Sequence, residues 1–460
     1  MSAEAAVART WPDYRTVWRW HFYAGLFCIP FVLWLATTGA IYLFKPQIEA
    51  WLDRPYDHLA IEGARASPQA IAAAALAAVP GSVLNAYELP PSPSAAVRVL
   101  VGHDAQMTRV YVHPQTRAIL HTVDEDARLM NLLQHLHGEL LLGDRGSMLV
   151  ELAASWAIVM LLSGLFLWWP RTGSGLAGII YPRLGGDRRR FWRDLHAVTG
   201  FWVSLFALFL LFSGLPWAKS WGGLLKEVRG LGQVTWVRQD WTSGRSSELA
   251  ARIEANSEAP VDEHAAHHRR HAGAAAMTFD LDALDRLVPV VQALALAAPV
   301  LIAPPSQANA GWSARSDAQN RPLRTNLSLD ATTATVTRRV DFDQRPLLDR
   351  AIGIGVAAHE GQLFGWLNQA LGLFAALGLI LVSLSALVMW WRRRRPGELG
   401  APRALPRARY AAALLALVIV IAVLLPLFGL SLLCVFVLER VLLRRIAGAR
   451  RFLGLQPAQG

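Results

Sequence analysis

The chain has 460 residues, of which 53% are hydrophobic and only 17% are charged, and its formal net charge is +11. A soluble protein of this size has about a quarter of its residues charged, so the composition indicates an integral membrane protein. The basic residues cluster beside apolar runs, which is typical of membrane topology, and we expect no nucleic-acid partner.

The cysteine content excludes several kinds of site. Cys28 and Cys434 both lie inside apolar runs. They cannot form a disulfide framework, a cysteine zinc site or a Cys-x-x-Cys-His attachment for covalent haem.

The first apolar run covers residues 17–44 and exceeds the roughly 20 residues that a spanning helix needs. Arginines lie in the preceding segment, residues 1–16, so we expect a cytoplasmic N-terminus without a cleaved signal peptide. Residues 45–146 then lie outside. They contain a predicted helix from Pro68 and alternating segments typical of strands, which together indicate a small α+β module.

Two further spans are predicted at residues 147–169 and 196–217. The loop between them, residues 170–195, carries six arginines and is the strongest indication of a cytoplasmic side. Residues 218–361 form a second outer module. It has a predicted helix near residues 281–297 and a closing strand pair whose pattern matches that of the first module.

The fourth span covers residues 362–391 and precedes a basic cytoplasmic loop, residues 392–409. A last apolar stretch, residues 410–443, is too long for one straight span at about 1.5 Å per residue. Because Pro426 interrupts it, we expect two short helices that return the C-terminus to the cytoplasm. A single tilted helix is the alternative. A basic tail, residues 444–460, follows.

One histidine motif occurs twice. His21 and His196 each follow aromatic and arginine residues, and each has a glycine four residues on, Gly25 and Gly200. The apolar run behind each histidine carries a hydroxyl–glycine pair at the same offset. These pairs are Thr38-Gly39 and Ser213-Gly214.

A second pair of histidines repeats in the same way. His137 and His359 each have a glycine six residues on and a Trp-Trp pair, from Trp168 or Trp390, at a matching distance. The pattern predicts an α-helical integral membrane protein with a duplicated helix–outer module–helix unit. We expect four core spanning helices, a C-terminal helical hairpin or single helix, and two small α+β extracytoplasmic modules.

The four histidines predict haem ligation. Ionisable residues in spanning helices are costly and therefore suggest function, and neutral imidazole is an axial ligand of haem iron. The topology puts His21 and His196 near the cytoplasmic ends of their helices and His137 and His359 near the outer ends. Since opposite ends are separated by about 30 Å, we predict two haem b groups, one held by each pair.

Several alternatives remain at the level of residues. Gly25 and Gly200 lie one helical turn after their histidines, where a missing side chain gives the flat macrocycle clearance. His135 competes with His137 as the outer ligand.

A histidine-rich cluster has i,i+4 spacing and could bind a divalent metal, although a solvated loop is favoured. Its members are His264, His267, His268 and His271. We find no hydrolase or dinucleotide-binding signature and predict no catalytic side chain.

Residues 17–395, with these histidine motifs, hydroxyl–glycine pairs and Trp-Trp ends, resemble the PepSY-associated transmembrane helix family. They are most similar to its iron-regulated members, which look like ferric-siderophore reductases of the bacterial inner membrane. Residues 68–123 are similar to a PepSY domain. The resemblance implies a haem-containing inner-membrane protein that passes electrons outward to an iron chelate.

The expected function is therefore electron transfer from a cytoplasmic or quinol donor, through the two haems, to a periplasmic ferric-siderophore. Reduction to Fe(II) weakens binding by hard oxygen ligands and releases the metal. Arg109, Arg117, Arg321 and Arg324 are candidate contacts for an anionic chelate. The rival hypotheses are a haem-free PepSY sensor or protease inhibitor and a di-haem carrier with a different periplasmic acceptor.

Overall fold

The structure is a computed structural model that describes residues 13–103, 106–170, 176–185, 187–231, 280–305, 311–405 and 412–455. The chain divides into two compact units. The first comprises Met1–Leu43, Gln134–Gln233 and Trp366–Gly460, and the second comprises Phe44–Leu133 and Val234–Gly365.

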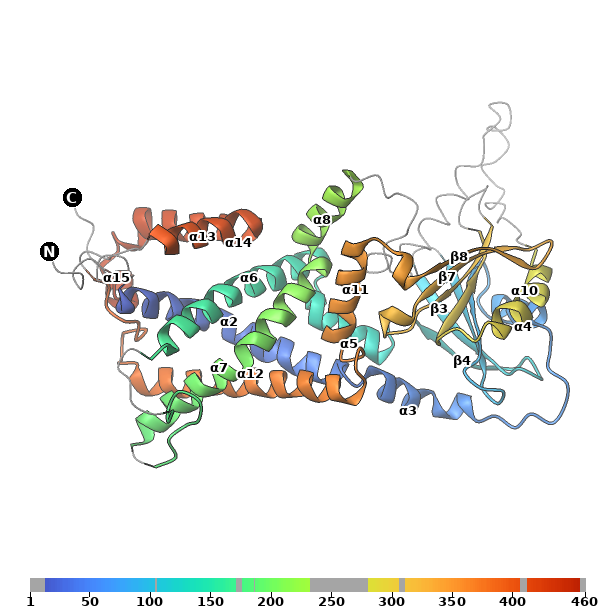
Figure 1. Cartoon of the computed structure of the whole chain (residues 1–460), viewed down its shortest axis with the longest axis horizontal. Helices are drawn as coiled ribbons and strands as arrows, with labels where there is room; N and C mark the ends of the chain where they lie inside the picture. Colours follow the sequence, from blue (N-terminus) through green and yellow to red (C-terminus); the bar gives the residue numbers. More distant parts are fainter. Residues whose placement is uncertain are drawn as a thin grey trace. The chain divides into compact units, whose positions relative to one another are not determined.

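Four long helices form the body of the first unit (Figure 1). They are α2 (Tyr14–Tyr42), α6 (Gly143–Trp168), α7 (Arg188–Gly214) and α12 (Trp366–Arg393). Helix α2 packs against α6 and α12, and α7 packs against the same two helices. With 26 to 29 residues each, they are about 39–44 Å long, more than the roughly 30 Å of a bilayer core.

Among the described residues, five helices are long and apolar enough to cross a membrane: these four, with α7 extended to Trp217, and Pro426–Leu443. The prediction of a helical, multi-pass membrane protein is confirmed. Helix α7 begins at Arg188, eight residues before the predicted span, because the Asp187 side chain accepts a hydrogen bond from the Arg189 backbone N–H and caps the helix.

The C-terminal apolar run divides at Pro426, as its sequence predicts. Helix α13 (Ala412–Leu424) and helix α14 (Pro426–Leu438) follow one another, and α14 continues into a π-helical turn, η6 (Glu439–Leu443), before α15 (Ala447–Leu453). Helix α14 packs on α6, where Trp156 Nε1 donates to Ser431 Oγ at 3.0 Å. Helix α13, with 13 residues, is about 20 Å long and shorter than a bilayer core.

Shorter helices flank the long ones. Helix α5 (Leu129–Glu139) leads into α6, and the turn between them contains Leu140 and Leu141, both with positive φ. The 3₁₀ turn η1 (Leu215–Trp217) leads from α7 into α8 (Lys219–Leu231). The first unit thus includes α8 and most of α5, which the sequence pattern assigned to the outer modules.

The second unit is built on one antiparallel sheet of eight strands in the order β4-β3-β2-β1-β5-β6-β7-β8. The first four strands are β1 (Val83–Glu88), β2 (Val97–His103), β3 (Gln106–Val112) and β4 (Ile119–Asp124). The other four are β5 (Val300–Ala303), β6 (Trp312–Ser316), β7 (Thr325–Asp330) and β8 (Thr335–Asp341). Two separate outer modules were predicted, but β1 pairs with β5 through Tyr87–Ile302 and Glu88–Leu301. This pairing removes one open edge from each set of four strands.

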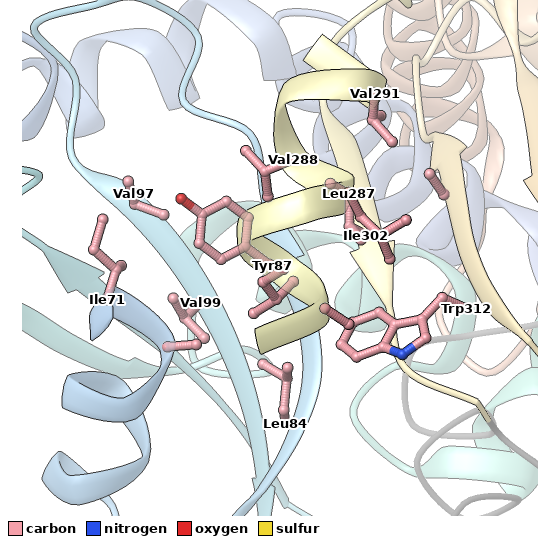
Figure 2. Packing of buried hydrophobic residues seen from close by; sticks show 14 of the residues in the cluster. Ile71, Leu84, Tyr87, Val97, Val99, Leu287, Val288, Val291, Ile302 and Trp312 are labelled. Carbon is pink, nitrogen blue, oxygen red and sulfur yellow. The ribbon is translucent and has the colours of Figure 1, made fainter. Parts of the chain in front are cut away.

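Two helices, α4 (Pro68–Ala78) and α10 (Asp282–Ala293), cover one face of this sheet. Figure 2 shows Ile71 of α4 and Leu287 of α10 among side chains from the strands, including Tyr87 and Trp312. Burial of these apolar surfaces is the main favourable term in the stability of the unit.

The remaining elements of the second unit are α3 (Lys45–Asp57), η4 (Arg321–Leu323), η5 (Phe342–Gln344) and α11 (Leu347–His359). Two turns of the sheet have the same local structure. His113 Nδ1 accepts the backbone N–H groups two and three residues on, and so does Asp330 Oδ1. The pKa of Asp330 is lowered because these N–H groups stabilise its charged form.

Candidate functional site

The structure brings His21 of α2 and His196 of α7 together inside the first unit. Their ring centroids are 6.2 Å apart, and the ring planes are inclined by 75°. His21 is the eighth residue of its helix and His196 the ninth. The two helices therefore present their histidines at nearly the same distance from their starts.

Helix α6 holds the ring of His21. Its Nδ1 lies 3.0 Å from the Met160 backbone oxygen and 3.2 Å from Ser163 Oγ. Gly164 follows directly, and a Cβ atom there would stand only 3.0 Å from His21 Cε1. The small residue therefore lets the imidazole lie against the helix.

Helix α12 holds the ring of His196 in the same way. Its Nδ1 lies 3.1 Å from the Val382 backbone oxygen and 3.2 Å from Ser385 Oγ. The next residue is again small, Ala386. Among the described residues, the Nε2 atom of neither His21 nor His196 has a hydrogen-bond partner.

The carbonyl contacts determine which nitrogen of each ring carries the proton. A backbone carbonyl can only accept, so Nδ1 of His21 and of His196 must be the N–H donor. In the neutral imidazole, Nε2 then carries the free lone pair. Nε2 is therefore the atom available to bind a metal.

His137 of α5 is held by α2. Its Nδ1 lies 3.0 Å from Thr38 Oγ1, and a Cβ atom at Gly39 would stand 3.1 Å from His137 Cε1. Trp34 Nε1 donates to the Leu136 backbone oxygen at 2.9 Å and attaches the end of α5 to α2. Burial lowers the pKa of His137 to about 4, so the ring is neutral at pH 7.

His359 is the last residue of α11 and belongs to the second unit, whereas His137 belongs to the first. The predicted pairing of these two histidines stays a prediction.

The hydroxyls of the two predicted hydroxyl–glycine pairs make the same local contacts. In the first unit, Ser213 Oγ of α7 donates to the backbone oxygens of Phe209 and Leu210. Thr38 Oγ1 makes the same two bonds, to the oxygens four and three residues before it.

The two glycines predicted to give clearance face little protein. Within the described ranges, a Cβ atom at Gly200 would meet nothing within 4 Å, and one at Gly25 would meet only Met160 Sδ at 3.9 Å. Gly164, which touches His21, was missed from the sequence. The signal was present, because Ser163-Gly164 is another hydroxyl–glycine pair of the kind noted at Thr38-Gly39.

Other predicted site residues have different environments. His135 is paired with Glu139 at 3.2 Å, and its side chain is 39% exposed. The histidine-rich cluster of residues 264–271 lies outside the described residues. Elsewhere, no group of three or more His, Cys, Asp or Glu side chains in the described ranges could hold a metal ion.

The arginines suggested as chelate contacts need a correction at Arg109. This residue is 2% exposed, and its guanidinium bonds to Glu88 at 2.7 Å and to Glu125 at 2.8 Å. A buried, doubly paired guanidinium cannot contact a chelate from solution. Arg324 instead donates to the backbone oxygen of Ala318 at 2.7 Å.

The end of α2 that carries His21 is attached to the C-terminal segment. Arg19 donates to the backbone oxygens of Pro402, Leu453 and Gly454, and the Tyr23 hydroxyl donates to Leu453 O at 2.6 Å. The histidine pair therefore lies at the end of α2 that contacts the C-terminal segment.

The spacing of the two rings fits an iron atom between them. A histidine nitrogen binds a metal at about 2.0 Å and the ring centre lies about 1.1 Å behind that nitrogen, so two rings on opposite sides of one iron have centres about 6.2 Å apart. Two histidines complete the coordination of haem, because the porphyrin supplies the other four nitrogens. The residues present thus fit bis-histidine haem.

The fold and site define a multi-pass helical membrane protein with a histidine pair held between its long helices. The PepSY-associated TM region family matches residues 18–393, and the chain belongs to this family. The match includes all four long helices from Trp18 to Arg393. A comparison with curated proteins found no match.

Proposed function

We propose that the chain is a haem b-binding electron-transfer protein of the bacterial inner membrane. The observation that carries the proposal is the 6.2 Å separation of the His21 and His196 rings, with both Nδ1 atoms hydrogen-bonded. When bound, haem supplies reversible one-electron chemistry. The side chains bind it, orient it and set its potential.

A second haem, with His137 as one of its ligands, is part of this proposal. It is supported by the environment of His137, which has a hydroxyl and an adjacent glycine against its ring, as His21 has. The sequence positions of His137 and His359 relative to their Trp-Trp pairs also agree.

We further infer that the chain contains a duplicated unit. Ser163 of α6 and Ser385 of α12 make equivalent contacts with a histidine. Trp168 and Trp390, at the ends of these helices, each donate to a backbone oxygen of the following segment. The strand order of the sheet agrees with a duplication, because β1 to β4 run outward from the centre on one side and β5 to β8 run outward on the other.

The proposed orientation has the N-terminus and the His21–His196 pair on the cytoplasmic side. Arginines gather at this end of the helices. Arg393 of α12 lies over the rings of Trp18 and Phe22 at 5.0 Å, and Arg188–Arg190 begin α7. Basic residues favour the cytoplasmic ends of spanning helices.

The proposed acceptor is a ferric-siderophore on the periplasmic side, with a cytoplasmic or quinol donor. Each electron delivered reduces one Fe(III) to Fe(II), which oxygen ligands of the chelate hold more weakly. Family resemblance supports this choice. Anaerobic mixing of the reduced protein with a ferric hydroxamate chelate should reoxidise it, whereas unchanged spectra would favour a carrier with another acceptor.

Haem content tests the proposal. The detergent-purified protein should give a pyridine haemochrome corresponding to two haem b per chain. His21→Ala or His196→Ala should remove one haem, while His135→Ala, a matched control, should remove none. A colourless protein from a haem-sufficient host would contradict the proposal and favour a haem-free sensor or inhibitor.

A further inference from the structure

Three histidines of the first unit share one type of binding environment, which we call a histidine seat. A seat consists of a backbone carbonyl at position i, a hydroxyl at i+3 and a small residue at i+4 of one helix. The seats are Met160, Ser163 and Gly164 for His21; Val382, Ser385 and Ala386 for His196; and Leu35, Thr38 and Gly39 for His137.

The proton of each seat hydroxyl is already used within its own helix. Ser163 Oγ donates to Met160 O at 3.0 Å, Ser385 Oγ donates to Val382 O at 2.8 Å, and Thr38 Oγ1 donates to Trp34 O at 2.9 Å. A hydroxyl has one proton but two lone pairs. Toward the imidazole, each oxygen can therefore only accept.

The same polarity holds in all three seats. Nδ1 of His21, His196 and His137 must donate, and each Nε2 keeps its lone pair. A hydrogen bond from Nδ1–H to an acceptor fixes the ring orientation of a metal-bound histidine and makes it a more basic ligand. A more basic axial ligand stabilises Fe(III) relative to Fe(II) and lowers the reduction potential.

We propose that Ser163, Ser385 and Thr38 are positioning residues that hold the haem-ligating histidines in the Nδ1–H tautomer and lower the haem potentials. The inference rests on the proposed function and adds the residues that tune it. Ser163 and Ser385 act on the haem held by His21 and His196. Thr38 acts on the other haem through His137.

Removal of a seat hydroxyl should change the potential without removing the haem. In Ser163→Ala the Met160 carbonyl still accepts from His21, and in Ser385→Ala the Val382 carbonyl still accepts from His196. With fewer acceptors at Nδ1, the equilibrium constant for reduction of Fe(III) to Fe(II) should rise about threefold in each variant. Because a tenfold change corresponds to about 59 mV for one electron, the reduction potential should rise by about 28 mV.

Spectroscopic redox titration of the purified full-length protein measures this directly. Ser155→Ala in α6 and Ser204→Ala in α7 are matched controls, because in the described part of the chain each hydroxyl bonds only to a carbonyl of its own helix, at Glu151 and Gly200. Ser163→Thr and Ser385→Thr keep the hydroxyl that the alanine variants lack, and they should therefore have the wild-type potential. Thr38→Ala should shift the other titration component.

The outcomes separate this inference from the proposed function. A wild-type protein without haem would overturn both. Haem at full occupancy with identical potentials in Ser163→Ala, Ser385→Ala and the two controls would overturn the positioning role and leave the proposed function standing. Upward shifts confined to the seat variants and reversed by threonine would support it.

Discussion

At the scale of single residues, the histidine site depends on side chains that are absent as much as on those present. Gly164 and Gly39 leave room for the rings of His21 and His137, because a Cβ atom would approach each ring within 3.0 or 3.1 Å. Real Cβ atoms rarely approach neighbours so closely in a packed interior, so either the ring or the helix must move when alanine is introduced.

Gly164→Ala should therefore displace the His21 ring and lower the haem content of the protein. The measurement is haem per chain by pyridine haemochrome, together with thermal unfolding in detergent. Gly223→Ala is a suitable control, since its Cβ would meet no described atom within 4 Å. Full haem occupancy with unchanged spectra in Gly164→Ala would contradict the close packing.

Gly200 gives the opposite test. Among the described residues, its Cβ would meet no atom within 4 Å outside the local helix backbone, and alanine in a helix is more favourable than glycine by about 1 kcal/mol. Gly200→Ala should leave the haem-free protein as stable as before or more so. It should reduce haem loading if the proposed macrocycle occupies that space. Undiminished haem loading in this variant would show that the macrocycle does not lie against Gly200.

At the scale of elements, α8 is held to α6 by buried polar groups. Glu151 is 2% exposed, and its Oε2 accepts from the backbone N–H groups of Ser220 and Trp221 at 2.9 and 3.4 Å. Ser147 Oγ, one turn earlier, accepts from Lys219 N at 3.1 Å. A carboxylate near a helix N-terminus accepts hydrogen bonds from the free N–H groups, and its negative charge interacts favourably with the positive end of the helix dipole.

Glu151→Ala should leave these N–H groups without partners and destabilise the protein by about 1–3 kcal/mol. The expected readouts are a lower unfolding temperature in detergent and faster proteolysis within α8. Glu151→Gln keeps an acceptor oxygen and should lose less. Equal losses in the two variants would mean that the N–H contacts are not the source of the stability.

In the second unit, Arg109 of β3 connects β1 to the segment after β4. It bonds to Glu88 and Glu125 in the interior, and all three residues are nearly inaccessible. Arg109→Ala should cost about 3–5 kcal/mol, because two carboxylates remain buried without their partner. Chemical unfolding measures this loss. A cost below about 1 kcal/mol would indicate that water reaches the carboxylates.

At the scale of the whole molecule, the sequence predicts those features that depend on patterns within one segment of the chain. The spans follow from hydropathy, and the proximity of His21 and His196 follows from equal depth in two repeated helices. The sequence does not predict the histidine seats, because Ser163 and Ser385 contact the histidines only after the four helices have packed. The single sheet was missed because the β1–β5 pairing joins strands more than 200 residues apart in sequence.

Electron paramagnetic resonance of the oxidised protein tests most directly whether His21 of α2 and His196 of α7 bind one haem. Since the His21 and His196 rings are inclined by 75°, the spectrum should contain the highly anisotropic low-spin signal that nearly perpendicular imidazole planes give. His196→Ala should abolish that signal. A wild-type spectrum with only an axial high-spin signal, or with no haem signal, would contradict the claim.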